Sequence, residues 1–572
     1  MEPLNGFWLP QHLRNQAIFA NAETGSQSFV RGRPCEPDDE GAVTAHWPIL
    51  DEAAWQRLLI GLKTNRRRAP QGRAFWQRMG TALESAARRF ADPADSLHAR
   101  ALAALPGYTG YSEGMIRASL SALNLWTLDP FPAAFDLNPS WAAVEDWQTM
   151  PGLPGRLRFY PASRPSPSLW TRLLGRPASL STRALLAPAP PLELVVGFGA
   201  GNVPGTALMI AFLAMATALE GGPPPSIVIR NSRREPILAP LLLDALEDAD
   251  PDLVASLAVL VWDHGDAAAQ QQVLARADLV IAAAGDQAIA EIEGSLHSGP
   301  RPTPARFHAH GHKVSFSAIG REVLAHDLRV AGEDTLLIQA VALLAALDSV
   351  FWDQHGCLSS RVHFVEDGGK GHYDYREFAA HLNQTLSMLA GVLPRGAWPR
   401  RPLRNAFDRY KQLERTGQLQ VLSGYDDDYV VIADERPLDA MAFASMVNEC
   451  QGRVIVIRPV GDLMDVPHGY LSLLPAVNLQ SLSVAVGRPS EGLSDGFLRF
   501  ATACGARGVT AIRTVGRGAF PQLAYSWDGL IPLDLVRQRD AGHFSTIEFD
   551  SPCDEIVDTY RQFLTFGFSF PA

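Results

Sequence analysis

Between residues 192 and 285 the chain alternates short apolar runs with longer stretches of helical spacing. The apolar runs lie at residues 192–197, 226–230, 257–263 and 278–285. The helical stretches between them lie at residues 205–220, 236–249 and 267–276. Such alternation predicts an open, largely parallel α/β sheet. Because ligands bind such sheets at the carboxyl ends of their strands, we look for functional residues in the turns that follow the strands.

A second α/β region follows the first. It begins with an apolar helix predicted over residues 336–352, and its predicted strands lie at residues 361–366, 429–434, 453–459 and 482–487. Ahead of both regions, residues 46–135 show apolar residues at helical spacing and are predicted to be mostly helical. Residues 161–191 are rich in proline and serine, which predicts a loop or linker.

Charge and cysteine content narrow the class of protein. The 572 residues carry 50 basic and 61 acidic side chains, so the basic surface of a nucleic-acid-binding protein is not expected. Five cysteines form no C-x-x-C pair, which argues against a disulfide scaffold or a zinc ribbon. The N-terminus lacks a signal-peptide pattern, and the longest apolar run, residues 205–219, is shorter than the roughly 20 residues of a spanning helix. We therefore expect a cytoplasmic protein without a membrane span.

The turn after the first predicted strand reads GFGAGNVP, residues 197–204. Its position between a strand and a helix is that of a dinucleotide-binding fingerprint, but Asn202 stands where the last glycine belongs. The glycines are also compatible with a plain tight turn. A third interpretation is chemical, because an asparagine amide held rigid by Pro204 could donate to a reacting oxygen.

Two further turns carry candidate residues. Arg230 ends the strand predicted at 226–230, and Ser232, Arg233 and Arg234 come directly after it. A cluster of three arginines at a strand end could hold a phosphate or could form a solvated loop. Cys357 lies in a turn rich in glycine and serine between the long apolar helix and the next strand. It is a candidate nucleophile if backbone N–H groups activate it. The alternative is a small core residue, which is the commoner role of a cysteine.

Three histidines, His308, His310 and His312, alternate within one predicted strand. Alternate residues share one face of a strand, so the three side chains could ligate zinc. Gly311 and Lys313 favour neither a rigid nor an anionic site. A histidine-rich strand without metal is therefore the preferred interpretation, and no metal is expected.

Taken in order, these segments resemble the aldehyde dehydrogenase superfamily, and within it the acyl-CoA reductase branch typified by the fatty-acyl reductase of bacterial bioluminescence. The resemblance rests on GNVP, SIVIRNSRREP, DLVIAAAGD, HGHKVSF and DQHGCLSSRVHFVE, at residues 201–204, 226–236, 278–286, 310–316 and 353–366. It implies a two-lobed α/β fold with a Rossmann-like nucleotide-binding domain and an α/β catalytic domain. It divides the chain into an N-terminal extension (1–45), a helical part of the cofactor lobe (46–160), the nucleotide-binding domain (161–335), the catalytic domain (336–540) and a C-terminal segment (541–572).

The resemblance also implies roles. Cys357 becomes the nucleophile and Asn202 the donor to the oxyanion, while Arg230, Ser232, Arg233, Gly285 and Asp286 contact the cofactor. Arg233 stands where relatives that prefer NAD carry Glu, which favours NADPH. The general-base Glu of the superfamily is missing, with His310 or a neighbour in its place. That absence favours reduction of an acyl thioester over hydrolytic oxidation of an aldehyde.

The substrate expected from this resemblance is acyl-CoA or an acyl-carrier thioester. An aldehyde dehydrogenase running in the other direction, a reductase of carrier-bound acyl groups and a non-catalytic protein of the same fold are the alternatives. Similar enzymes form homo-oligomers and often work with an acyl-activating partner protein, so we expect both for this chain.

Overall fold

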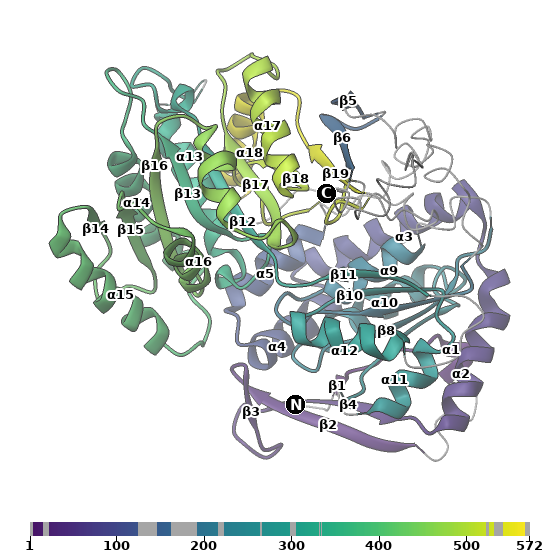
Figure 1. The fold of residues 1–572 in the computed structure, drawn as a ribbon. Helices are drawn as coiled ribbons and strands as arrows, with labels where there is room; N and C mark the ends of the chain where they lie inside the picture. The colour runs from purple at the N-terminus through teal and green to yellow at the C-terminus, as the bar shows by residue number, and fades with distance from the viewer. Residues whose placement is uncertain are drawn as a thin grey trace, which may run out of the picture.

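The structure is a computed structural model. It describes residues 4–14, 22–123, 146–150, 152–161, 192–215, 222–263, 266–297, 305–330, 332, 334–521, 525–530 and 542–566. The linker expected at 161–191 lies outside these residues, apart from Pro161. Within the described part of the chain the strands form three sheets. The two larger sheets lie in separate halves of the molecule (Figure 1).

One half is built on a five-stranded sheet in which every pairing is parallel. Its order is β11 (Arg306–His310), β10 (Leu279–Ala283), β7 (Leu194–Phe198), β8 (Ser226–Arg230) and β9 (Leu257–Leu260). The helices that follow these strands are α9 (Thr206–Met215), α10 (Leu238–Ala249), α11 (Ala267–Leu274) and α12 (Asp286–His297). This sheet confirms the α/β fold that the alternating sequence pattern predicts.

Both faces of this sheet are covered because successive side chains of a strand point in opposite directions. Val195 packs in one apolar cluster with residues of α9 and α10. Val196 packs in a second cluster with residues of α11 and α12 and with α2 (Glu52–Asn65). Burial on both faces explains why the strands read as continuous apolar runs.

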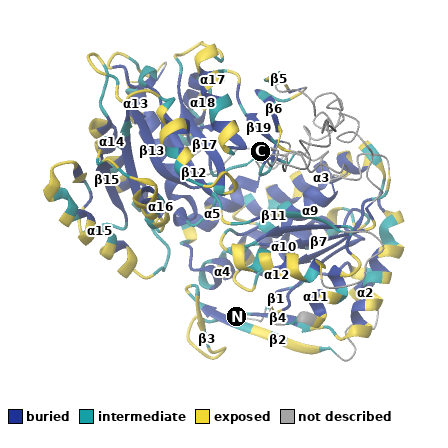
Figure 2. Cartoon of the chain, viewed as in Figure 1, coloured by how far each residue is buried: buried dark blue, intermediate teal, exposed yellow. Residues whose placement is uncertain are grey.

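The other half is built on a ten-stranded mixed sheet. Its order is β14 (Leu419–Val421), β15 (Val430–Asp434), β16 (Val454–Val460), β13 (Ser360–Glu366), β12 (Val314–Ile319), β17 (Leu479–Ala485), β18 (Ala511–Thr514), β19 (Gly542–Ile547), β6 (Arg156–Pro161) and β5 (Gln148–Thr149). The longer helices of this half are α13 (Leu337–Val350), α14 (Tyr375–Val392), α15 (Arg401–Leu413), α16 (Ala440–Glu449), α17 (Asp495–Arg507) and α18 (Pro552–Phe566). Its central strands β13, β12 and β17 are buried, whereas α15 carries exposed residues on its outer side (Figure 2).

Sheet membership differs from the boundaries expected from the sequence. The change from one sheet to the other falls between β11 and β12, after His310, and not after residue 335. The strand β6 belongs to the ten-stranded sheet, although residues 46–160 were expected in the cofactor lobe. The physical reason is long-range pairing, because β6 pairs with β19 and β12 pairs with β13 and β17.

The N-terminal residues form a small sheet of their own, in the order β1 (Leu4–Asn5), β4 (Val43–Ile49), β2 (Glu23–Val30) and β3 (Arg33–Cys35). The backbone of Trp8 makes a reciprocal pair of hydrogen bonds with Val259 on the edge strand β9. The extension therefore covers the edge of the parallel sheet, which would otherwise offer free hydrogen-bonding groups. Helices α2, α3 (Gly72–Ala91), α4 (Ser96–Thr109) and α5 (Glu113–Ala122) follow, so the helical region begins at residue 52 and not at 46.

One helical segment of the described residues, Leu337–Gln354, is long and apolar enough to cross a membrane by length and composition. It comprises α13 and the short turn after it, and 94% of it is buried inside the molecule. That burial is typical of a core helix.

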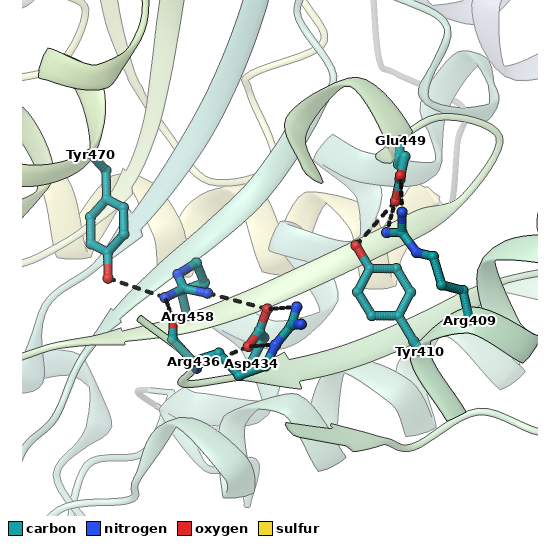
Figure 3. Close-up of polar contacts among 7 residues, drawn as sticks. All are labelled: Arg409, Tyr410, Asp434, Arg436, Glu449, Arg458 and Tyr470. Atoms are coloured by element: carbon teal, nitrogen blue, oxygen red, sulfur yellow. Dashed lines mark hydrogen bonds and ion pairs between the residues drawn. The ribbon is translucent and has the colours of Figure 1, made fainter. Parts of the chain in front are cut away.

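A buried ion cluster closes the end of β15. Asp434, at 0% exposure, pairs with Arg436 at 2.8 Å and with Arg458 at 3.2 Å (Figure 3). Arg458 lies on the neighbouring strand β16 and is 2% exposed. Its guanidinium also donates to the carbonyl oxygen of Arg436 and to the Tyr470 hydroxyl. The cluster therefore joins β15, β16 and the turn at Tyr470.

Candidate active site

A cavity of about 490 Å³ lies where the turns after the parallel strands face the turn that leads into β13. Residues from both halves of the molecule line it, which agrees with the rule that open sheets bind ligands at their strand ends. Five of the seven residues that the resemblance assigns to catalysis or to the cofactor line this cavity: Asn202, Arg230, Ser232, Gly285 and Cys357.

The turn that carries Cys357 has an unusual backbone. Trp352, Asp353 and Gln354 all adopt positive φ values, of 57°, 48° and 63°. Left-handed conformations of bulky residues cost energy and persist only where the surroundings hold them. The holding residue is Arg453, whose Nε donates to Asp353 at 2.7 Å and whose backbone N–H donates to the Gln354 amide oxygen at 3.1 Å.

Further hydrogen bonds fix the same turn. The second carboxylate oxygen of Asp353 accepts from the Gly396 backbone N–H and from the Trp398 indole, both at 3.0 Å. The Ser315 hydroxyl donates to the carbonyl oxygen of Cys357 at 2.8 Å. Buried contacts from three separate segments thus set the orientation of Cys357 before any substrate arrives.

The thiol of Cys357 is neutral in this environment. Burial raises its pKa to about 11, and the nearby Asp528 carboxylate acts in the same direction. A hydrogen bond from the Gln480 side chain and the backbone N–H groups of Cys357 and Leu358 oppose the rise but do not cancel it. Because the thiolate is the reactive form of a cysteine, Cys357 would need a base in order to act as a nucleophile.

Asn202 lies in the turn between β7 and α9 and is tied to the cysteine turn. Its side-chain amide donates to the carbonyl oxygen of His355 at 2.8 Å. The backbone carbonyl oxygen of Asn202 accepts from the Tyr111 hydroxyl at 2.5 Å. An asparagine amide has two N–H groups, so one can hold the turn while the other faces the cavity.

The arginines after β8 have different surroundings. Arg230 is buried, its Nε donates to the carbonyl oxygen of Trp262 at 3.0 Å, and burial lowers its pKa to about 10. Arg234, the third arginine of the cluster, also lines the main cavity. Arg233 instead lines a separate pocket of about 160 Å³ and pairs with Asp263 at 2.5 Å. Of the expected cofactor residues, Arg230, Ser232 and Gly285 line the main cavity, whereas Arg233 lines the separate pocket.

Gly285 and Asp286 lie at the start of α12. A Cβ atom at Gly285 would meet nothing within 4 Å, so this turn is open toward the cavity. The Asp286 carboxylate accepts from the backbone N–H of His312 at 2.7 Å. It thereby joins the turn after β10 to the turn after β11.

The three alternating histidines do not act together. His310 hydrogen-bonds through Nδ1 to Asp528, and its ring lies 3.7 Å from that of Trp527, between ring centres. The backbone N–H of His312 is held by Asp286. Among the residues that the structure describes, no group of three or more His, Cys, Asp or Glu side chains could hold a metal ion.

Comparison with known proteins places the chain in a family. The model of the family described as acyl-CoA reductase (LuxC) matches residues 180–538. The chain belongs to the LuxC acyl-CoA reductase family. Its matched region includes Cys357, Asn202 and the arginines after β8.

Relatives and solved structures agree with this assignment. The long-chain acyl-protein thioester reductase of Aliivibrio fischeri is 26% identical over 358 residues, which are 61% of this chain and 64% of that protein. The match thus spans less than two thirds of this relative. A benzaldehyde dehydrogenase from Corynebacterium glutamicum has the same fold, with a TM-score of 0.51 at 14% identity over 91% of this chain and 98% of that one. An aldehyde dehydrogenase from Brucella melitensis has a TM-score of 0.52 at 12% identity, over 96% and 97%. The two-lobed aldehyde dehydrogenase fold expected from the sequence is confirmed.

In this LuxC-family chain, sequence reasoning missed Gln480, Trp527 and Asp528. Asp528 lies 218 residues from the histidine that it contacts. Its tripeptide Trp527-Asp528-Gly529 is typical of a turn, and no local pattern marks it as a partner of His310. Only the folded chain shows that these residues adjoin Cys357.

Proposed function

We propose that this chain reduces an acyl thioester to the aldehyde through an acyl group carried on Cys357, with NADPH as the reductant. The observation that carries the proposal is the single cavity that holds Cys357, Asn202 and the open turn at Gly285. The proposed nucleophile Cys357, the proposed oxyanion donor Asn202 and a ligand site at the strand ends therefore share one cavity. Membership of the LuxC family supports the same conclusion.

The residues at the strand ends fit a phosphate-bearing dinucleotide. Arg230, Arg234 and Lys313 bring positive charge to the cavity, and the N-terminus of α12 opens onto it at Gly285. Helix N-termini and arginines both favour phosphate oxygens. At Gly201 any side chain would collide, since a Cβ would lie 2.1 Å from the Ser232 hydroxyl, so the backbone turn stays close to Ser232.

The chain's own residues carry the acyl-transfer chemistry. The Cys357 sulfur attacks the thioester carbonyl, and the negative charge that develops on its oxygen is held by the Asn202 amide and the Cys357 backbone N–H. The carrier thiol leaves, and the acyl group remains on Cys357. A bound nicotinamide would supply the hydride that reduces it. Cys357 then departs as the sulfur leaving group when the aldehyde forms.

The apolar wall of the cavity supports a long acyl chain. Leu123, Met209, Phe351 and Phe520 line the part formed by the helices and by the turn near residue 520. Such a wall takes up hydrocarbon and excludes water. The thiol carrier is coenzyme A or a protein, and the name of the Aliivibrio fischeri relative specifies an acyl-protein. All five cysteines are unpaired, which supports the cytoplasmic setting, and we retain the expectation of a homo-oligomer with an acyl-activating partner.

The decisive experiment follows NADPH oxidation with acyl-CoA and acyl-protein thioesters of increasing chain length while trapping the aldehyde. The expected result is chain-length-dependent oxidation that disappears in Cys357→Ala. Cys35→Ala is the matched control, because this partly exposed cysteine of β3 lies in the small N-terminal sheet.

Two outcomes would contradict the proposal. Reduction of NAD(P)⁺ by aldehydes, without turnover of any thioester, would favour an aldehyde dehydrogenase. Full activity in Cys357→Ala would remove the acyl-enzyme from the mechanism.

A further inference from the structure

Polar atoms without partners gather around Cys357. Within the described residues, the buried atoms Nε2 of His308, Nε2 of His310, Oε1 of Gln480 and Oδ1 of Asp528 have no hydrogen-bond partner. Three of these four residues line the same cavity as Cys357, and the fourth, His308, packs edge to face against His310 with 4.3 Å between ring centres. Buried polar atoms are almost always paired, so a group of exceptions at one place calls for a chemical reason.

His310 and Asp528 form the centre of this group. His310 Nδ1 hydrogen-bonds to Asp528 Oδ2, and the two side chains are 6% and 3% exposed. Burial acts to raise the pKa of Asp528, but His310 and Lys313 hold it below its ordinary value, so the carboxylate is ionised. A carboxylate at Nδ1 keeps the proton of a neutral imidazole on that nitrogen, which leaves Nε2 with a free electron pair.

The pair lies on the wall of the cavity that holds the nucleophile. Asp528 is close enough for its charge to act on the Cys357 thiol, and Gln480, which hydrogen-bonds to that thiol, is another of the residues with an unpartnered atom. The thiol needs a base in order to attack, and the departing thiolate of the substrate needs an acid. One histidine can serve both needs in turn.

We propose that His310, oriented by Asp528, carries a proton from the Cys357 thiol to the departing thiolate of the substrate. This inference rests on the proposed function. As the Cys357 sulfur bonds to the acyl carbon, its proton moves to His310 Nε2. When the bond from the acyl carbon to the carrier sulfur breaks, that sulfur takes the proton from Nε2. The products are an acyl group on Cys357, a neutral carrier thiol and His310 in its starting state.

The test measures the acyl-transfer half-reaction alone, in the absence of nicotinamide, as released thiol and as acylated protein by mass. The variants are His310→Gln and Asp528→Asn. The matched control is His297→Gln, an exposed histidine at the end of α12. Each protein is given a long-chain alkyl thioester and an aryl thioester whose thiol has a low pKa.

We expect His310→Gln to slow acylation by the alkyl thioester by roughly 10²–10⁴-fold, the usual contribution of a positioned acid or base. The loss should be much smaller with the aryl thioester, because its thiolate leaves without protonation. Acylation by the variant should also rise with pH from 7 to 9 as the thiolate forms. Asp528, His308 and Lys313 are the charged or titratable groups around His310, and all three are retained in that variant.

Equal losses with the two thioesters would overturn this proposal, because a structural role would not depend on the leaving group. A loss below about threefold would overturn it as well. If His310→Gln does not fold, as judged by circular dichroism, the same comparison in Asp528→Asn decides. Failure of the wild-type chain to acylate Cys357 would instead overturn the proposed function, and this inference with it.

Discussion

Substitution of a single residue, Arg233, tests the expected preference for NADPH over NADH. It lies beside Asp263 at the rim of a pocket apart from the main cavity, and both side chains are largely exposed. Such an exposed pair contributes little stability, so Arg233 can turn to an added phosphate at small cost. Arg233→Glu should raise the KM for NADPH about tenfold or more, since charge-assisted hydrogen bonds contribute about 1.5–3 kcal/mol. The KM for NADH should change little.

The measurement is steady-state kinetics with both cofactors at saturating thioester. Arg276→Glu, at an exposed residue just after α11, carries the same change of charge and should leave both KM values as they are. An unchanged preference in Arg233→Glu would show that Arg233 does not meet the phosphate.

Local sequence located some of the candidate site and missed the rest for a physical reason. Cys357 and Asn202 were found because each lies in a turn between a strand and a helix, where the chain itself marks a strand end. Asp528 and Gln480 were missed because their roles arise from contacts with segments far away in the sequence. The sequence did not show that Arg234 lines the main cavity and Arg233 the separate pocket, because the direction in which consecutive turn residues face depends on the backbone path.

Among the elements, the strand pair β15–β16 offers a test of stability. Asp434→Asn removes the negative charge that offsets the buried guanidinium of Arg458. Breaking a buried ion pair by removing one partner costs about 3–5 kcal/mol, because the remaining charge is left uncompensated. We expect the free energy of unfolding in urea to fall by that amount.

Asp426→Asn is the matched control for this variant. Asp426 is 87% exposed and lies 3.7 Å from Arg404, so its loss should change stability by less than about 1 kcal/mol. Equal effects of the two substitutions would show that the buried cluster is not a source of stability.

Helices and strands could be predicted where the local sequence pattern marks them. The four strands from 192 to 285 and the helices between them were identified because apolar runs and helical spacing are readable within about fifteen residues. The partners of a strand are not readable in this way. The sequence did not show that β12 pairs with β13 and β17, because these strands begin 46 and 165 residues later, at residues 360 and 479 against 314.

For the molecule as a whole, buried thiols predict how stability depends on pH. Burial raises the pKa of Cys450 to about 12, and burial also raises that of Cys504. In the unfolded chain these thiols ionise near pH 8.5, so above that pH the unfolded state releases protons that the folded state retains. Stability should therefore be full below about pH 8.5 and fall above it, by about 1.4 kcal/mol per pH unit for each such thiol.

Urea unfolding under reducing conditions at pH 7.5 and pH 9.5 measures this effect. Cys450→Ala has one such thiol fewer, so its loss of stability between the two pH values should be about 1.4 kcal/mol smaller than that of the wild type. Other groups that titrate in this range are common to both proteins and cancel in the comparison. Identical losses would contradict the prediction.

The ten-stranded sheet has a consequence for how the chain is made. Its strand β6 ends at residue 161, and the strand that pairs with it, β19, begins at residue 542. During synthesis the parallel five-stranded sheet can form once residue 310 has left the ribosome, whereas β6 must wait for almost the whole remaining chain. A polypeptide that ended before β19 would leave the edge of β6 open to pairing with other chains. We therefore expect the edge at β6 to need protection from other chains from its own synthesis until β19 has been made.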